Sequence, residues 1–141
     1  MLDKEGVGHP DHVVLTMGSE VRDIKFRLWD NHQQCWVRRT DGIYLMPNTA
    51  GIYRFKPRAG QHYIVMQYTG VNDDSGIPLY VDDIVKWRYD KSYPWYVDQV
   101  RFRDGMFLIG NEPIGLHASH DAQRIVIGNV YDNPELHRRI V

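Results

Sequence analysis

The sequence predicts a mainly β fold with only short helical turns, and three observations lead to that prediction. Several short segments alternate apolar and polar residues with the period of two that a half-buried strand shows. Glycine and proline residues separate these segments, which is typical of turns between strands. Aromatic residues, which favour strands, make up 12% of the chain. They fit either a β-rich core or a contact surface, and the core is the preferred interpretation.

Length and composition indicate one ordered domain. The chain has 141 residues, of which 43% are hydrophobic and 25% charged, as expected for a globular protein. The formal net charge of −1 provides no overall attraction to nucleic acid or to a membrane. No apolar segment approaches the roughly 20 residues that span a bilayer, and the N-terminus lacks a signal-peptide pattern. The single cysteine, Cys35, excludes an internal disulfide, so we expect a cytoplasmic protein with no membrane partner.

Three regions are expected along the chain. Residues 1–20 are rich in glycine and proline and are expected to be an N-terminal extension or a flexible arm, with room for one short strand. Residues 21–65 are expected to form an N-terminal β region. Residues 66–141 are expected to form a second β region that ends in a helical turn.

The N-terminal β region begins with a clear alternation. Ile24 and Leu28 are out of phase with Lys25 and Arg27, which predicts a half-buried strand whose polar face also carries Trp29. A turn at 30–32 and a second strand at 34–38 complete a hairpin. Further strands are expected at 43–46, 52–55 and 62–68, the last being the longest.

The second β region contains the strongest turn signals. A polar segment, 69–80, predicts a tight turn, and its acids lack the spacing of a calcium loop. A strand at 81–89 has apolar residues on both faces, which is typical of a central or interface strand. Strands at 96–103 and 106–110 flank an Asp-Gly pair that predicts a hairpin, and a strand at 124–131 closes the body. Five such strands meet the needs of a small SH3-like barrel.

The end of the chain predicts a short helix. Asn133 is a preferred residue before a helix, Pro134 suits the first helical position and Glu135 suits the first turn. Arg138 and Arg139 stand at the favourable C-terminal end.

Three motifs, at residues 22–30, 66–70 and 126–136, resemble in that order the YopX family of phage and prophage proteins. The similarity covers residues 21–30, 66–87 and 126–136. It departs at Val81-Asp82, where the family typically has Glu-Gly, and Asp is one of the few other residues that tolerate positive φ. The resemblance implies a YopX-like β fold with an SH3-like barrel on the C-terminal side, a bacterial host cell and self-association. It implies no biochemical activity.

One segment pair has the composition of a contact surface. Aromatic and cationic residues interleave at 86–89 and 101–103, and the residues singled out are Lys86, Trp87, Arg88, Tyr89, Arg101 and Arg103. Tryptophan, tyrosine and arginine are enriched in protein interfaces, which is the favoured interpretation. The alternative is a stacking surface for single-stranded nucleic acid. The neutral charge balance and the nearby acidic turns argue against that alternative.

Catalytic and metal sites are weakly supported. His117, His120 and Asp121 could share one face of a helical turn, so a metal-dependent hydrolase is a third, unfavoured hypothesis. No phosphate-binding loop or nucleophile elbow appears, and Cys35 is expected to be a small buried hydrophobe. We therefore predict no metal, no cofactor and no catalytic residue. The expected function is that of a phage accessory protein that binds an unidentified phage or host protein and assembles as a homo-oligomer.

Overall fold

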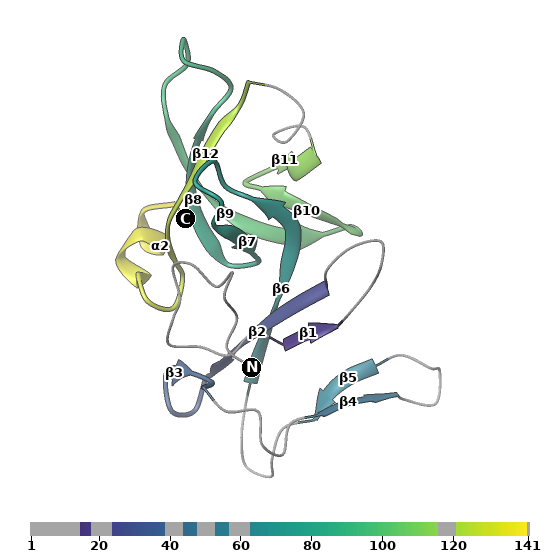
Figure 1. The fold of residues 1–141 in the computed structure, drawn as a ribbon. Coiled ribbons are helices and arrows are strands. Elements are labelled where there is room, and N and C mark those ends of the chain that lie inside the picture. The colour runs from purple at the N-terminus through teal and green to yellow at the C-terminus, as the bar shows by residue number, and fades with distance from the viewer. Residues whose placement is uncertain are drawn as a thin grey trace.

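The computed structural model describes residues 15–17, 24–38, 44–47, 53–56, 63–115 and 121–140. Antiparallel strands dominate these residues, and a single short helix follows them near the C-terminus (Figure 1). The elements are β1 (Leu15–Met17), β2 (Ile24–Asp30), β3 (Cys35–Trp36), β4 (Tyr44–Pro47), β5 (Tyr53–Lys56), β6 (Tyr63–Asn72), β7 (Pro78–Tyr80), β8 (Asp83–Arg88), β9 (Tyr96–Arg103), β10 (Met106–Ile109), β11 (Glu112–Pro113), β12 (Gln123–Asn129) and α2 (Pro134–Ile140). The predicted mainly β class is confirmed.

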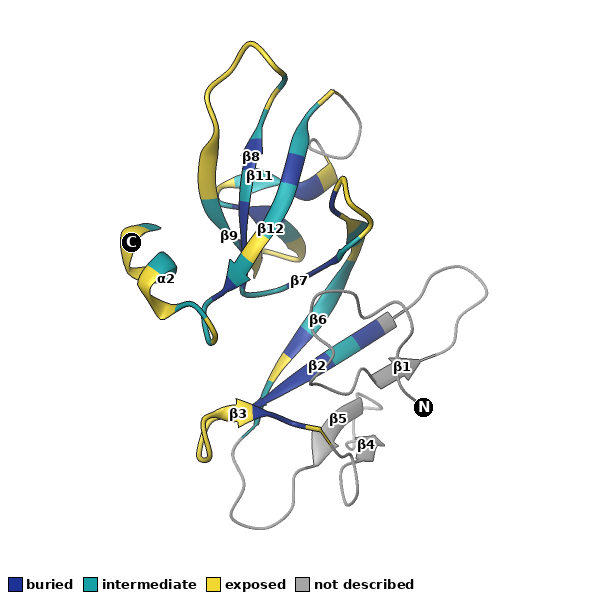
Figure 2. Cartoon of the chain, turned by 60° about the vertical axis from the view of Figure 1, so that its left-hand side comes forward, coloured by how far each residue is buried: buried dark blue, intermediate teal, exposed yellow. Residues whose placement is uncertain are grey.

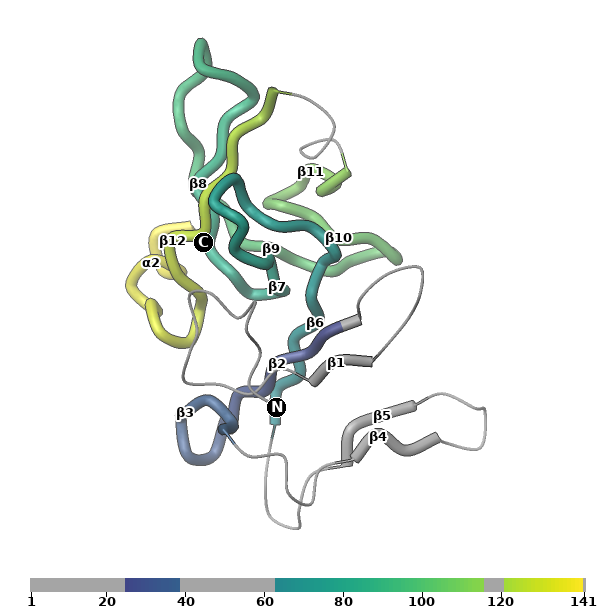
Figure 3. Tube along the Cα trace, in the orientation of Figure 1, coloured from purple at the N-terminus to yellow at the C-terminus, as the bar shows by residue number. Residues whose placement is uncertain are grey.

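The described strands form two curled antiparallel sheets and one separate pair. The first sheet has the order β1-β2-β6-β7, with β3 paired to β2, and the second has the order β11-β10-β9-β8-β12. Strands β4 and β5, which were predicted as separate short strands, pair with each other. The long strand β6 runs from β2 toward the second sheet (Figure 3). Since β6 pairs with β2 and β7 and not with the second sheet, the narrower expectation of an SH3-like barrel stays a prediction.

Strand β2 is buried on both faces, so the predicted half-buried strand is wrong. Lys25 and Trp29 are almost completely buried, as is Leu28 on the opposite face, and Arg27 is 0% exposed. Figure 2 shows this strand largely in the colour of buried residues. The alternation is real, but the polar face is covered by a neighbouring part of the chain.

Arg27 is held by groups from the β7–β8 segment and from β3. Its Nη2 atom donates to Oδ1 of Asp83 at 2.7 Å, and this ion pair is buried. The guanidinium carbon lies 4.9 Å from the ring centroid of Trp36 and 4.8 Å from that of Tyr80. Asp83 also accepts the backbone N–H of Tyr80. The sequence pattern predicted that this face of β2 would be in contact with solvent. Around Arg27 it instead contacts a paired carboxylate and two aromatic rings.

The β2–β3 hairpin forms as predicted, but the predicted burial of Cys35 is wrong. Trp29 stands opposite Trp36, and the Asp30 carboxylate accepts the backbone N–H groups of the turn. Cys35 is exposed, whereas Trp36 is buried. Because neighbouring strand residues point to opposite faces, the burial of the larger tryptophan places the cysteine in solvent.

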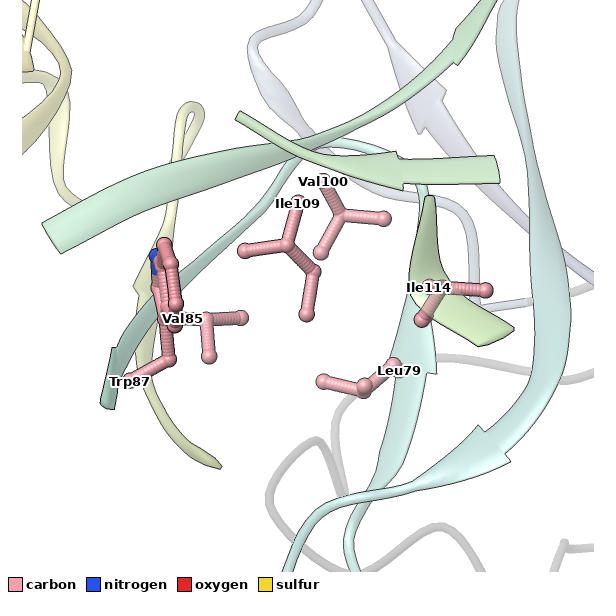
Figure 4. Packing of buried hydrophobic residues seen from close by; sticks show 6 residues of the cluster. All are labelled: Leu79, Val85, Trp87, Val100, Ile109 and Ile114. Atoms are coloured by element: carbon pink, nitrogen blue, oxygen red, sulfur yellow. The ribbon is translucent and has the colours of Figure 1, made fainter. Parts of the chain in front are cut away.

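The second sheet surrounds the larger core cluster. The buried members of this cluster are Leu79, Val85, Trp87, Val100, Ile109 and Ile114, whose side chains converge in Figure 4. Ile84 and Val85 are both 0% exposed, so the predicted burial of both faces of β8 is confirmed. The Asp104-Gly105 hairpin is confirmed as well, with both residues at positive φ as a type I′ turn requires.

The polar turn after β6 attaches to the outer edge of β12. The Asp73 carboxylate accepts the backbone N–H groups of Ser75 and Ile77 through Oδ1 and that of Val126 through Oδ2. The Asp74 N–H donates to the carbonyl of Arg124, whose own N–H donates back to the Asp74 carboxylate. The acidic turn thus satisfies strand groups that would otherwise face solvent.

The third sequence motif forms the connection from β12 to α2. The Asn129 side chain is 0% exposed, and it accepts the N–H groups of Tyr131 and Asp132. A side chain at Gly128 would collide with the amide of Asn133, which explains the glycine. The helix begins at Pro134, as predicted.

Asp82 adopts a φ of 74°, which confirms the positive φ expected at that position.

Candidate binding surface on the β8–β9 hairpin

The β8–β9 hairpin projects from the second sheet and ends in an exposed tip (Figure 2). It carries all six surface residues predicted from the sequence, four at positions 86 to 89 and two, Arg101 and Arg103, on β9. Strand alternation sends these residues to two opposite faces, because Lys86 stands opposite Val97 while Trp87 stands opposite Tyr96. The predicted set therefore does not form a single surface.

Trp87 belongs to the core and not to a surface. Its side chain is 4% exposed, and its Nε1 atom donates to Oδ2 of Asp98 at 2.7 Å. The predicted contact role does not suit a ring that is already enclosed. Trp87 instead supports the exposed rings of Tyr89 and Tyr96, which pack against it.

One face of the hairpin, here called the tyrosine face, consists of Tyr89, Tyr93 and Tyr96. Their exposed fractions are 43%, 47% and 41%. The ring of Tyr89 lies 4.9 Å from Trp87 and 5.1 Å from Tyr93, both edge-to-face, and Tyr96 lies 5.0 Å from Trp87. Burial against these neighbours and the nearby Glu112 carboxylate raise the pKa of Tyr89. The Tyr89 hydroxyl therefore stays protonated, and the face is mainly aromatic.

The opposite face, here called the Trp95 face, consists of Lys86, Arg88, Trp95, Val97 and Arg101. The Lys86 Nζ atom lies 4.7 Å from the centroid of the Trp95 ring, and the Arg88 Cζ atom lies 4.2 Å from it. Arg88 also donates from Nε to Gln123. Trp95 and Val97 stay 37% and 43% exposed.

The remaining predicted arginines follow the same alternation. Arg101 is exposed and in phase with Val97 on the Trp95 face. Arg103 is exposed at the end of β9, where it lies 3.9 Å from the Asp104 carboxylate and donates to Asn111. Arg103 is thus drawn to the β9–β10 turn and away from the tryptophan.

Sequence reasoning missed Tyr93, Trp95, Tyr96 and Val97. A signal was available, because Trp95 and Val97 share the phase of Arg101 and Arg103 and therefore stand on the polar side of the strand. An aromatic residue in the polar phase indicates either a contact surface or a second buried face. The partial exposure of Trp95 supports the first explanation.

The predicted metal candidates cannot be assembled into a site. His117 and His120 lie outside the described residues, and Asp121 is exposed. Asp121 lines an open cavity of about 540 Å³ together with Asp90, Lys91, Ser92 and Gln123. Hydrogen bonds from Ser92 lower the pKa of Asp90, with a smaller effect of the Arg88 charge. In the parts of the chain that the structure describes, no three histidine, cysteine or acidic side chains are grouped to hold a metal ion.

No helix within the described residues combines the length and the apolar character needed to cross a membrane.

Comparisons with known proteins relate this chain to one family. The family model described as YopX protein matches residues 25–137. The crystal structure of protein EF1440 from Enterococcus faecalis is similar, with 20% sequence identity and a TM-score of 0.53 over 80% of this chain and 96% of that chain. The X-ray structure of YopX from Bacillus subtilis is similar over 79% of this chain and 95% of that chain, with 25% identity and a TM-score of 0.51. No curated protein matches.

Proposed function

Because the chain belongs to the YopX family, we propose that it acts by binding and not by catalysis, as a self-associating protein-interaction module of the bacterial cytoplasm. The tyrosine face of the β8–β9 hairpin is the proposed contact, and a second copy of the chain is its first partner. An unidentified phage or host protein is the partner of the resulting assembly.

The observation that carries this proposal is the exposure of three tyrosine rings on a projecting hairpin. Tyr89, Tyr93 and Tyr96 are each more than two-fifths exposed, although each packs against at least one other ring. Rings that are already held in place lose little conformational entropy on binding, and each can bury a large area. Such a cluster of tyrosines is typical of the centre of a protein interface.

The use of the acidic side chains also favours binding over catalysis. Asp73 and Asp83 are buried, and each accepts at least one backbone N–H group. Asp98 and Asp132 accept the indole N–H groups of Trp87 and Trp36. Carboxylates that hold the fold together in this way are poorly placed to converge on a substrate.

The test is the mass of the protein in solution as a function of concentration. We expect wild-type protein to associate and the Tyr93→Ser variant to weaken association at least about tenfold, since interface tyrosines commonly contribute more than 1.4 kcal/mol. Sedimentation equilibrium measures both values.

Phe102→Ser is the matched control. Phe102 is 57% exposed at the far end of β9, next to the β9–β10 turn, so the substitution removes an accessible ring from a place away from the hairpin tip. It should leave the association constant unchanged. A wild-type protein that stays monomeric at the highest concentration reached, or a Phe102→Ser variant that dissociates as readily as Tyr93→Ser, would refute the tyrosine face as the contact.

A further inference from the structure

We propose that the Trp95 face of the β8–β9 hairpin binds single-stranded nucleic acid, which is a function separate from self-association through the tyrosine face. The proposal rests on three features of the face: cations that are not in an ion pair, a stacking surface and the arrangement of the two relative to each other.

The cations of this face take part in no ion pair within the described residues, and the one carboxylate that senses them is Asp90, whose pKa the Arg88 charge helps to lower. Among the described residues, the ion pairs join Arg27 to Asp83 and Arg103 to Asp104, and neither involves Lys86, Arg88 or Arg101. Asp82, which directly precedes β8, instead accepts hydrogen bonds from Gln99 and Tyr131. The cations on this face are therefore available to phosphate groups.

The formal net charge of −1 is a sum over the whole chain and does not describe the charge of a single face, since acids and bases are both found among the buried residues. The acids Asp73 and Asp83 are at most 5% exposed and serve as internal acceptors. Lys86 and Arg88 are only half-buried, and Arg101 is exposed. A chain that is neutral overall can thus present a cationic face, which is the electrostatic pattern of a nucleic-acid surface.

Trp95 supplies the stacking surface. Its indole is 37% exposed, and Lys86 and Arg88 stand within cation–π distance of the ring. Stacking on an aromatic side chain does not depend on the identity of the base, and it requires bases that are not already stacked in a duplex. Val97 extends the apolar area beside the ring.

The combination favours nucleic acid over an acidic peptide. Each nucleotide of a single strand carries one flat base and one phosphate, and this face offers a partly exposed ring with two cations held over it. An acidic peptide would use the cations but would leave the exposed indole without a matching group. Charge complementarity and stacking together therefore select the nucleotide strand.

The experiment measures binding of the full chain to a fluorescein-labelled oligo-dT of about 16 nucleotides by fluorescence anisotropy. We expect affinity to fall steeply between about 50 and 200 mM salt. Trp95→Ala should weaken binding about 5- to 150-fold, the range for losing one stacked base. Lys86→Gln should reduce the slope of log K against log salt by about 0.7, the value for one phosphate contact on a single strand.

Controls separate this proposal from the preceding one and from misfolding. Tyr93→Ser should bind the oligonucleotide like wild type, and Trp95→Ala should keep the wild-type association constant in sedimentation. Trp95→Phe retains an aromatic ring and should recover part of the affinity. Circular dichroism and the urea midpoint establish that each variant is folded.

Two results would overturn the proposal. One is a wild-type protein that does not bind the oligonucleotide at low salt, or that binds it equally well without Trp95. The other is poly-glutamate binding with the same affinity and the same dependence on Trp95, which would assign the face to an acidic protein.

Discussion

At the scale of single residues, Arg27 shows how a charged side chain becomes part of the interior. It is 0% exposed, between two aromatic rings and against the carboxylate of Asp83. Burying two ions costs several kcal/mol each, and their attraction offsets that cost only while both are present. Removing either partner alone is therefore expected to cost more stability than the intact ion pair contributes to the fold.

The Arg27→Met variant should lose about 3–5 kcal/mol of unfolding free energy at about pH 7, because it leaves the Asp83 charge buried and unpaired. Urea denaturation measures the loss. The double variant Arg27→Met with Asp83→Asn should recover much of it, since asparagine keeps an acceptor for the Tyr80 N–H without the charge. A single variant that costs less than about 1 kcal/mol, the range of an exposed pair, would contradict the buried pair.

The same variant should respond to acid in a defined direction. Burial raises the pKa of Asp83, while the Arg27 charge and the Tyr80 N–H oppose that rise. Without Arg27 the pKa in the folded state rises further, and folding then favours the protonated carboxyl, so the stability contribution is present at low pH and lost as pH rises. The difference in stability between wild type and Arg27→Met should therefore narrow as pH falls from about 7 toward the ordinary value of 3.8.

At the scale of elements, the turn that follows β6 acts as an extension of the second sheet. Strand β12 stands at the edge of that sheet, and the carboxylates of Asp73 and Asp74 accept N–H groups from its free side. Asp73 is buried, whereas Asp74 is exposed. The hydrogen bonds to the buried Asp73 are therefore expected to contribute more to stability than the hydrogen bond to the exposed Asp74.

Asp73→Ala should destabilise the protein by about 2–4 kcal/mol, because three backbone N–H groups lose a charged acceptor in a partly buried site. Asp74→Ala is the matched control and should cost less than about 1.5 kcal/mol, since it removes an exposed acceptor. Thermal or urea denaturation of both variants measures the difference. Equal costs for the two substitutions would show that burial of Asp73 is unimportant.

Most strands could be predicted from the sequence because alternation and turn residues are local signals. The Asp104-Gly105 hairpin and the helix at Pro134 depend only on neighbouring residues, and both are confirmed. The burial of Arg27 depends on Asp83, which lies 56 residues away, so no local pattern reveals it. The same limit explains why the predicted surface mixed the enclosed Trp87 with the half-buried Arg88, whereas the contacts of Trp95 became evident only from the folded hairpin.

At the scale of the whole molecule, contacts among the described residues join the first sheet to the second sheet and to the β12–α2 connection. Arg27 of β2 pairs with Asp83 of β8, and the Trp29 ring stacks on Tyr131 at 5.0 Å. The Trp36 indole N–H donates to the Asp132 carboxylate, just before α2. Burial and the neighbouring Asp82 raise the pKa of Tyr131, so this hydroxyl stays protonated and donates to Asp82. The two sheets are therefore expected to unfold as one cooperative unit.

Tyr131→Ala should lower the unfolding free energy by up to about 3 kcal/mol and should do so for both sheets together. Native-state amide exchange of β2 and β6 in one sheet, and of β8 and β12 in the other, measures this directly. Tyr131→Phe keeps the ring on Trp29 and should retain most of the protection. Faster exchange confined to one of the sheets would show that the sheets unfold independently.

Because the four tryptophans differ in burial, the intrinsic fluorescence of the protein can distinguish one of them from the others. Trp29, Trp36 and Trp87 are at most 9% exposed, whereas Trp95 is 37% exposed. Enclosed indoles emit at shorter wavelengths and are shielded from acrylamide, so the quenchable, long-wavelength part of the emission belongs to Trp95. Acrylamide quenching of the intrinsic fluorescence therefore measures whether a ligand or a second copy of the chain covers Trp95. The measurement needs no label and uses concentrations far below those that sedimentation requires.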